Sequence, residues 1–567
     1  MNVFRFTGAG YCALWGSLLS GVLTSCGSEP TADVLLFNGH FTTLDSLYPS
    51  VTALAMADGR ILALGDPDEL REQYRFAREQ DLEGRWVYPG FIDAHCHVVA
   101  YAKSLRTVDL TQTHNEAEAV ELLVRRVREI ESGAGPLEVI EGWGWDNTQW
   151  PDGALPASEQ LSAAFPDREV RLRRVDGHAL WVNQAVLKRY GIEPTSAVEG
   201  GEIRWCTGGS GAVLIDRAQE WVPEVEWNRE ALSAALMDAE PHLLASGLTG
   251  VNDAGLDTAQ LFVLRRLYRE GRLHLPINAM ASDDSASFAY FLEHGPIEED
   301  RFRVRSFKFY ADGALGSHGA LLLEPYADRP EHQGLSLRRR DFLKTRFTQL
   351  KEAGFQVCTH AIGDSANRQV LRLYAEVLGD GGNPRRWRIE HAQVVHPWDW
   401  ALFGQYRILP SVQPTHAVSD ADWVLDRLGT ERLERAYAYR SLWEQNKRLP
   451  LGTDFPIESI DPLRTFRAAV FRSDSPEGRH PSLTASESLS PEQALRGMTL
   501  DAAYAQYRDT QTGSLSVGKY ADLVVLDVDL LHCTLEESLR ARVLQTWLRG
   551  EKAFDHRSAA ESKPSHR

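Results

Sequence analysis

The chain has 567 residues, 43% of them hydrophobic and 25% charged, which is an ordinary globular composition. Its formal net charge of −18 argues against a nucleic-acid partner, because phosphate backbones are bound by clustered Lys and Arg side chains. The length allows several domains, or one long barrel-type unit with smaller additions.

The first 26 residues differ from the rest of the chain. A moderately apolar run, TGAGYCALWGSLLSGVL, ends in the motif LTSC at Cys26. The run is too short and too rich in Gly and Ser for a membrane-spanning helix, so we interpret residues 1–26 as a signal peptide. The motif resembles a bacterial lipobox, although an ordinary cleaved signal with a chance cysteine is the alternative. We predict an exported protein, lipid-anchored through Cys26 and facing the periplasm or the exterior.

The cysteines beyond this segment show no framework spacing. An exported protein can oxidise some of them, but the sequence cannot pair them. They are Cys96, Cys206, Cys358 and Cys533. Strand alternation turns Cys96 away from its neighbours His95 and His97, so we expect it to be a packing residue.

Both ends of the remaining chain have the pattern of short strands with turns. Residues 32–88 contain DVLLFNGHFTTLD and SVTALAMADGRILALGD, in which Asp58-Gly59 is a two-residue hairpin signal. Residues 507–555 contain GSLSVGKYADLVVLDVD and ARVLQTWLRGEKAF, which look similar. We predict one small composite β-sandwich built from both ends.

Residues 89–506 alternate between short apolar runs and helical patterns. In one helical stretch Leu343, Phe347 and Leu350 recur at i, i+4 and i+7, on one face of a helix. Eight strands alternating with helices are typical of an α/β (β/α)8 TIM barrel, with an open doubly wound sheet as the competing architecture. The predicted strands are WVYPGFIDAHCHV, LTGVNDAG (248–255), LPINAMAS (275–282), VRSFKFYADG (304–313), FQVCTHAIGD (355–364), WRIEHAQ (387–393), ILPSVQPTH (408–416) and LPLGTDFP (449–456).

One gap interrupts the alternation. The stretch between the first and the second predicted strand is too long for a single crossover helix. We interpret residues of about 112–226 as an insertion that covers the barrel mouth. It contains EGWGWDNTQWPDG and VDGHALWVNQAV.

Polar residues gather at the predicted carboxyl ends of the barrel strands, where barrel enzymes carry their chemistry. Residues i and i+2 of a strand share a face, so His95 and His97 could bind one metal ion. Each polar residue alone has an ordinary structural explanation, such as a salt bridge for Lys308 or a turn cap for Asp454. Together they predict a metal site formed by His95, His97, Lys308, His360, His391 and Asp454.

These residues resemble the ligand set of the amidohydrolase superfamily. The phrases FYADGALGSHGALLLEPY, THAIGDSANR, IEHAQ, SVQPTH and LGTDFPIE are similar to the branch called amidohydrolase family 3, which includes N-substituted formamide deformylases. DGHALWVN and GSLSVGKYADLVVLD fit the same branch, so the resemblance covers about residues 32–555. The motifs are specific for the branch and much less specific for the substrate.

The resemblance implies a centre with one or two metal ions. His95, His97 and Asp454 would hold the more buried ion, and His360 and His391 the more exposed one. Imidazole and carboxylate ligands suit zinc, although other divalent metals could replace it.

The resemblance also implies a carboxylated lysine. An uncharged Lys308 could react with carbon dioxide, and the resulting carbamate could bridge two ions. A one-metal site with an unmodified Lys308 is the alternative.

The implied reaction is hydrolysis of an amide or a related non-peptide C–N bond in a small molecule. Metal-bound water has a pKa of about 7 and gives hydroxide at neutral pH. Asp454 would be the general base towards this water and the general acid towards the leaving nitrogen. A deaminase or a lactone or ester hydrolase could use the same site, and a non-catalytic binding protein could keep the same barrel. The oligomeric state stays open, a homodimer included.

Four further residues are candidates for the substrate side. His178, which we also count as a catalytic candidate, and His416 could reach a substrate carbonyl; a structural hydrogen bond is the alternative for His178. Asp312 follows the fourth strand and could support Lys308. Trp145 could form the wall of an apolar pocket, since aromatic side chains offer large contact areas. A place in the core of the insertion is the alternative for Trp145.

Overall fold

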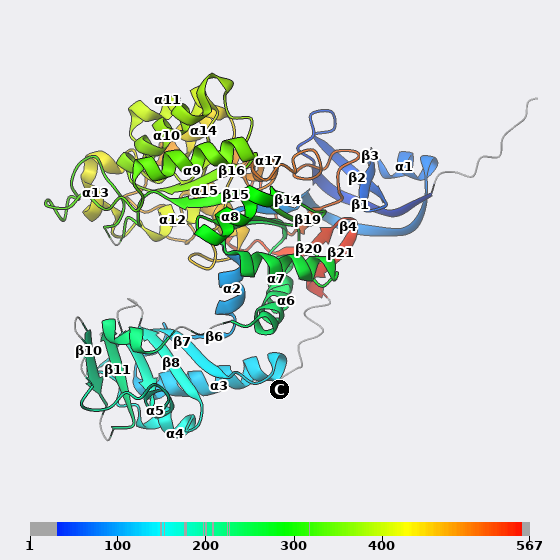
Figure 1. Cartoon of the computed structure of the whole chain (residues 1–567). Helices are drawn as coiled ribbons and strands as arrows, with labels where there is room; N and C mark the ends of the chain where they lie inside the picture. Colours follow the sequence, from blue (N-terminus) through cyan, green and yellow to red (C-terminus); the bar gives the residue numbers. More distant parts are fainter. Residues whose placement is uncertain are drawn as a thin grey trace, which may run out of the picture.

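The computed structural model of the chain has three regions, a barrel, a composite sheet and an insertion lobe (Figure 1). It describes residues 31–557, except for 148, 149, 152, 175–178, 197, 199, 200, 207, 208, 224, 226 and 317. Cys26 and His178 lie outside the described residues, so the predictions made for them stay predictions. No helix in the described part of the chain is both long and apolar enough to cross a membrane.

Seven parallel strands and one short segment form the predicted (β/α)8 barrel. The strand order is β18-β17-β16-β15-β13-β12-β5, and β14 (Ile297–Glu298) pairs with β15. At the eighth predicted position the amide of Gly452 donates to the carbonyl of Val412 at 3.0 Å, and the amide of Asp454 donates to that of His95 at 2.8 Å. This segment joins β18 to β5 and closes the barrel. The strands are β5 (Phe91–Cys96), β12 (Leu248–Leu256), β13 (Ile277–Ser282), β15 (Phe302–Tyr310), β16 (Gln356–Ala361), β17 (Arg388–His391) and β18 (Leu409–Ser411).

Helices cover the outside of the barrel (Figure 1). On α9 (Arg340–Ala353) the buried residues are Leu343, Phe347 and Leu350, as the i, i+4, i+7 pattern predicts. Phe347 packs edge-on against Phe309 of β15, with 5.1 Å between the ring centroids. The other helices of this region are α2 (Val98–Ser104), α6 (Arg229–Ala245), α7 (Thr258–Arg269), α8 (Ser285–His294), α10 (Asp364–Leu378), α11 (Pro397–Tyr406), α12 (Pro414–Ser419), α13 (Val424–Leu433), α14 (Tyr439–Asn446), α15 (Pro462–Phe471), α16 (Pro491–Gly497) and α17 (Leu500–Ala505).

The inward-facing side chains of the barrel form successive layers, which follow from the register of the strands. Side chains at i and i+2 of a strand share a face, and paired residues on neighbouring strands lie at the same level. One level contains Lys308, Cys358 and Arg388, and the next, towards the carboxyl ends, contains Tyr310, His360 and Glu390. Cys358 therefore lies below His360 as a buried packing residue.

Residues from both ends of the chain form one seven-stranded sheet of order β21-β20-β19-β4-β1-β2-β3. The sheet folds over, because the amide of Ala521 donates to the carbonyl of Gly59 in the β2–β3 turn at 3.0 Å. One apolar cluster then joins Leu54 of one half to Trp547 of the other. Asp58 and Gly59 have φ angles of 50° and 72°, as the predicted hairpin turn requires. The elements are β1 (Thr31–Thr42), β2 (Ser50–Ala57), β3 (Arg60–Gly65), α1 (Pro67–Gln73), β4 (Arg75–Pro89), β19 (Leu523–Leu526), α18 (Leu535–Leu539), β20 (Val543–Leu548) and β21 (Glu551–Asp555).

The insertion forms a lobe that stands apart from the barrel in Figure 1. Its six-stranded sheet has the order β10-β11-β9-β8-β7-β6 and begins at Thr107, slightly before the predicted start. At the junction Arg106 pairs with Asp238 of α6 at 2.7 Å. That the lobe covers the barrel mouth stays a prediction. The elements are β6 (Thr107–Asp109), α3 (Glu116–Ala134), β7 (Val139–Trp145), α4 (Glu159–Ala164), β8 (Glu169–Arg174), β9 (Ala179–Asn183), α5 (Gln184–Tyr190), β10 (Gly201–Trp205) and β11 (Gly211–Asp216).

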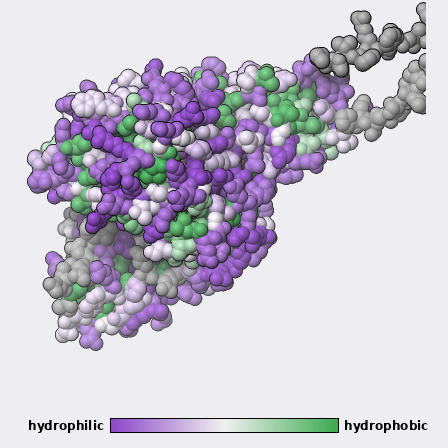
Figure 2. All heavy atoms as spheres, turned by 45° about the horizontal axis from the view of Figure 1, so that its top comes forward, coloured by the Kyte–Doolittle hydropathy of each residue, from purple (hydrophilic) through white to green (hydrophobic). Residues whose placement is uncertain are grey.

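The surface is mainly polar. Figure 2 shows a face that is largely hydrophilic, with hydrophobic side chains in small separate groups. The most exposed large apolar side chains of the described residues are Trp398, Leu47 and Ile457, at 84%, 81% and 71% exposure. Ile457 follows Asp454 closely in the chain and donates its amide to the Asp454 carbonyl at 2.9 Å. The backbone of Ile457 is therefore tied to that of a predicted metal ligand.

Candidate metal centre

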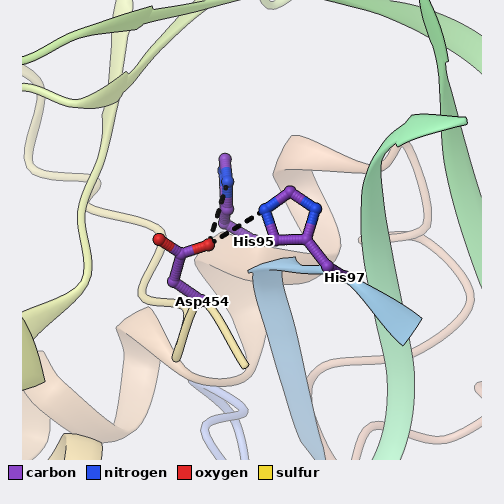
Figure 3. A group of neighbouring side chains, drawn as sticks. All are labelled: His95, His97 and Asp454. Atoms are coloured by element: carbon purple, nitrogen blue, oxygen red, sulfur yellow. Dashed lines mark ion pairs between the residues drawn. The ribbon is translucent and has the colours of Figure 1, made fainter. Parts of the chain in front are cut away.

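Two histidines at the end of β5 face one carboxylate. His95 is fully buried, and His97, with a side chain 24% exposed, is the N-cap residue of α2. Nε2 of His97 lies 3.1 Å from Oδ1 of Asp454, and Nε2 of His95 lies 3.5 Å from the same oxygen. Figure 3 shows both rings directed at that oxygen. The structure thus brings together three predicted ligands in a group that could hold a metal ion.

Backbone turns orient two of the candidate ligands. His391 and Asp454 have φ angles of +73° and +66°, left-handed values that are uncommon for residues with a Cβ atom. Because Glu390 faces the barrel interior, regular alternation would turn His391 towards the helices; the positive φ brings it to the site instead. Such strain costs on the order of 1–3 kcal/mol and is typically retained at functional sites.

Lys308 reaches the same centre from the level below. Its side chain is buried, and Nζ lies 3.1 Å from Nε2 of His95. Burial lowers the pKa of this amine, although the carboxylates of Glu390 and Asp454 act against that shift. Lys308 is therefore buried beside the first ligand group, with a bias towards the uncharged amine.

His360 and His391 form a second histidine pair, with ring centroids 4.5 Å apart. Two buried ring nitrogens of this pair have no hydrogen-bond partner in the described residues: Nε2 of His360 and Nδ1 of His391. Burying such atoms without partners is costly, so their convergence indicates a ligand from outside the chain. Imidazole and carboxylate donors are those of zinc and related divalent ions, so the residues present fit a metal ion.

The electrostatics of the site favour metal binding at neutral pH. Burial lowers the pKa of His95 to about 4 and that of His360 to about 3, which keeps both imidazoles uncharged. Burial alone would raise the pKa of Asp454, but hydrogen bonds, first that from His416, hold it well below its usual range. The centre therefore offers uncharged nitrogen donors and a charged oxygen donor, the forms that bind metal.

His416 lies against Asp454. Its Nε2 is 3.0 Å from Oδ2 of Asp454, and its Nδ1 is 3.4 Å from Glu458. Burial alone would lower the pKa of His416, but hydrogen bonds to these two carboxylates raise it to about 10. With His391 and Asp454 it makes a second group of side chains that could hold an ion. Its predicted contact with substrate stays a prediction.

Sequence reasoning missed Glu390. Its Oε2 lies 2.6 Å from Nδ1 of His95, and its Oε1 lies 2.6 Å from Nε of Arg388, with all three residues fully buried. Burial alone would raise the pKa of Glu390, but Arg388 and His95 lower it to about 2. The available signal was two charged residues inside a strand of a parallel barrel, where burial on both faces favours apolar side chains.

Sequence reasoning also missed Tyr310, which is two residues beyond Lys308 on the same face of β15. The centroid of its ring is 4.8 Å from Nζ of Lys308 and 5.3 Å from the ring of His360, and the residue is 36% exposed. Burial raises the pKa of Tyr310 to about 12, so the hydroxyl stays protonated. Tyr310 therefore gives the site an aromatic wall with a hydrogen-bond donor.

Asp312 lies beside His360. Its Oδ1 is 3.6 Å from Nε2 of His360, and its carboxylate accepts hydrogen bonds from three backbone amides at 2.8 to 3.0 Å. These bonds tie the loop after β15 to the loop after β16. Asp312 therefore supports the backbone around His360, and its predicted support of Lys308 stays a prediction.

Trp145 belongs to the core of the insertion lobe. It is fully buried, its Nε1 donates to the carbonyl of Leu172 at 2.8 Å, and its ring packs against Trp181 at 6.0 Å. A register shift beside Gly144, with φ of +90°, separates it from Trp143, which is 44% exposed. The prediction that Trp145 forms the wall of a substrate pocket is wrong, and the alternative core role is the correct one.

Comparison with known proteins agrees with the fold. A family model described as the amidohydrolase family matches residues 78–554. Protein LONG AFTER FAR-RED 3 of Arabidopsis thaliana is 33% identical over 97% of each chain. An N-substituted formamide deformylase of Arthrobacter pascens is 24% identical over 92% of this chain and 98% of its own. A metal-dependent hydrolase structure from Pyrococcus horikoshii OT3 superposes with a TM-score of 0.74 at 26% identity, over 89% of this chain and 99% of its own.

The (β/α)8 barrel, the candidate metal site at its rim and the similarity to a metal-dependent hydrolase place the chain in the class of metal-dependent hydrolases. The chain belongs to the amidohydrolase family, as its sequence motifs predict. Its general activity is therefore that of a hydrolase.

Proposed function

We propose that the chain hydrolyses an amide or a related non-peptide C–N bond of a small molecule, with bound zinc or a similar divalent ion. The observation that carries this proposal is the grouping of His95, His97 and Asp454, with His391 also close to Asp454 and His360 packed against His391. The similarity to an N-substituted formamide deformylase supports a C–N bond as the target. The donor set supports zinc, because zinc sites combine imidazole and carboxylate ligands.

Two ions could share this centre. In this proposal His95, His97 and Asp454 hold one ion, and His360 and His391 hold the other.

The proposal includes a carboxylated Lys308 that bridges the ions. Formation of a carbamate needs an uncharged amine, and the lowered pKa of the buried Lys308 supports that state. The position of its Nζ, 3.1 Å from Nε2 of His95, supports a place among the ligands.

A divalent ion at this centre supplies a Lewis acid that polarises the scissile carbonyl and acidifies water. In this proposal the Asp454 carboxylate accepts the proton of the attacking water and returns it to the leaving nitrogen. His416 lies 3.0 Å from Oδ2 and so fixes the rotation of the carboxylate. The protonated hydroxyl of Tyr310 donates to the carbonyl oxygen as that oxygen gains charge.

The location of the protein is part of the proposal. We propose export through residues 1–26 and a lipid anchor on Cys26, on the strength of the LTSC motif. We also propose that His178 contacts the substrate carbonyl from the insertion, on the strength of the DGHAL phrase.

The test is metal analysis of the purified chain together with a screen of N-formyl and N-acyl amines. We expect one or two equivalents of zinc, and release of free amine that a chelator abolishes and added zinc restores. Release of ammonia from amino-substituted rings alone would indicate a deaminase, and opening of lactones alone would indicate an ester-type hydrolase. Metal binding without any turnover would indicate a binding protein.

A further inference from the structure

The barrel interior contains an ion pair that has no part in the proposed hydrolysis. Arg388 and Glu390 alternate on β17, so their side chains share the inward face. Both are fully buried, and Nε of Arg388 lies 2.6 Å from Oε1 of Glu390. Because the desolvation of two buried charges can exceed their attraction, such a pair is weak as a source of stability. Its position therefore calls for another explanation.

The ion pair crosses the barrel to a candidate metal ligand. The free oxygen of the pair, Oε2 of Glu390, lies 2.6 Å from Nδ1 of His95, although β17 and β5 are separated by β18 and the 450–454 segment. A carboxylate oxygen can only accept, so Nδ1 carries the hydrogen and Nε2 keeps its lone pair. Nε2 is the atom that faces Asp454 at 3.5 Å.

The surroundings of Arg388 leave Glu390 as its charge partner. Its Nε also lies 3.3 Å from Sγ of Cys358, and one terminal nitrogen lies 3.5 Å from Sδ of Met280. Sulfur atoms are weak acceptors and do not balance the charge of a guanidinium group. Arg388 therefore holds Glu390 by charge and by contact, and leaves one carboxylate oxygen for His95.

We propose that Glu390, held by Arg388, is a positioning residue that fixes the tautomer and ring orientation of His95 for metal binding. The inference rests on the proposed function in one respect, namely that His95 binds a metal ion. A partner of this kind on the outer nitrogen of a ligating histidine typically contributes about 10–100-fold to metal affinity. Arg388 and Glu390 would thus form a fixed support beneath the centre.

The test is titration of the metal-free chain with Co²⁺, followed by the visible absorption of the bound ion. We expect E390Q to weaken Co²⁺ binding by about 10–100-fold and to shift the absorption bands. R388M should act in the same direction, because Glu390 loses its anchor. The matched control is E487Q, which neutralises another buried glutamate, one that binds the amide and hydroxyl of Ser441 at 2.9 and 2.7 Å. This control should keep the affinity and the spectrum of the wild type.

Equal affinity and equal spectra of E390Q and the wild type would overturn the proposal. If neither E390Q nor R388M folds, a crystal structure of the zinc-loaded wild type decides. Zinc on Nε2 of His95 with Glu390 on Nδ1 is the expected result, whereas zinc on Nδ1, or Glu390 turned away, overturns the role. A wild type that binds no Co²⁺ contradicts the proposed function and this role with it, whereas equal binding by the wild type and E390Q contradicts the positioning role alone.

Discussion

Buried ring nitrogens at the barrel rim and the buried indole of Trp145 in the insertion lobe differ in how they are paired. At the rim, Nε2 of His360 and Nδ1 of His391 are buried without a hydrogen-bond partner in the described residues. In the lobe, the N–H group of Trp145 is equally buried but donates to the carbonyl of Leu172 at 2.8 Å. Single unpartnered atoms also occur elsewhere, for example Nε of Arg171 in the lobe. The comparison therefore teaches that such atoms indicate a binding site only where several potential metal ligands gather, as they do at the rim.

The largest effect is expected when the rim loses its carboxylate. D454N keeps the shape of the side chain but removes its ability to accept a proton, so kcat should fall by about 10³-fold, the scale of general acid–base catalysis. The measurement is kcat with the metal content determined in parallel. A wild-type kcat at unchanged metal content would show that Asp454 does not transfer the proton.

A smaller loss of kcat is expected when Lys308 is replaced. K308A should lose one metal equivalent and lower kcat by about 10²-fold, within the range of a single catalytic group. Short carboxylic acids should restore part of the activity, because they supply the anionic oxygens of the missing carbamate. The measurements are metal stoichiometry and kcat with and without added acetate. Full activity of K308A would leave only a one-metal site in which Lys308 is not a ligand.

The pH dependence of metal retention should reflect burial at the rim. The pKa of His95 is about 4 and that of His360 about 3, below the ordinary value of 6.5, so protons compete with metal only in acid. Metal content should stay constant down to about pH 5 and fall below about pH 4. In the unfolded chain these histidines bind protons near pH 6.5, whereas in the folded chain they stay uncharged down to about pH 4. Acid therefore favours the unfolded chain, and the free energy of unfolding should decline as the pH falls from about 6.5 towards 4. Metal loss centred near pH 6.5 would contradict burial of the ligands.

The smallest effect on activity is expected in the lobe. W145F keeps most of the packing but loses the N–H donor to Leu172, so it should lower the free energy of unfolding by about 1 kcal/mol and leave kcat and KM unchanged. Urea unfolding and steady-state kinetics measure the two effects. A change in KM without a change in the free energy of unfolding would indicate that Trp145 contacts the substrate and would contradict its role in the core of the lobe.

Much of the barrel could be predicted because its signals are local. Each predicted strand is a short apolar run that can be recognised from neighbouring residues alone. The polar residue at its carboxyl end identifies the rim of the barrel, even when the contacts between distant parts of the chain are unknown. Lys308 illustrates this, since its phenylalanine neighbours Phe307 and Phe309 must face the helices if the lysine faces the interior. The structure buries both rings and the lysine accordingly.

The remaining features depend on contacts or backbone angles that a single sequence does not display. The bond between Glu390 and His95 joins residues 295 positions apart. Two charged residues inside the strand mark Glu390 as unusual, but nothing near it identifies His95 as its partner. Trp143 and Trp145 have equivalent spacing in the sequence, yet the register shift between them exposes one and buries the other. The positive φ of His391 likewise reverses the face that regular alternation assigns to it.

The most direct test of a metal centre at the rim is diffraction from zinc-loaded crystals on both sides of the zinc absorption edge. We predict an anomalous peak about 2.0–2.1 Å from Nε2 of His95 and of His97 and about 2.0–2.2 Å from a carboxylate oxygen of Asp454. A zinc-loaded crystal with no peak in contact with these three side chains would contradict the account.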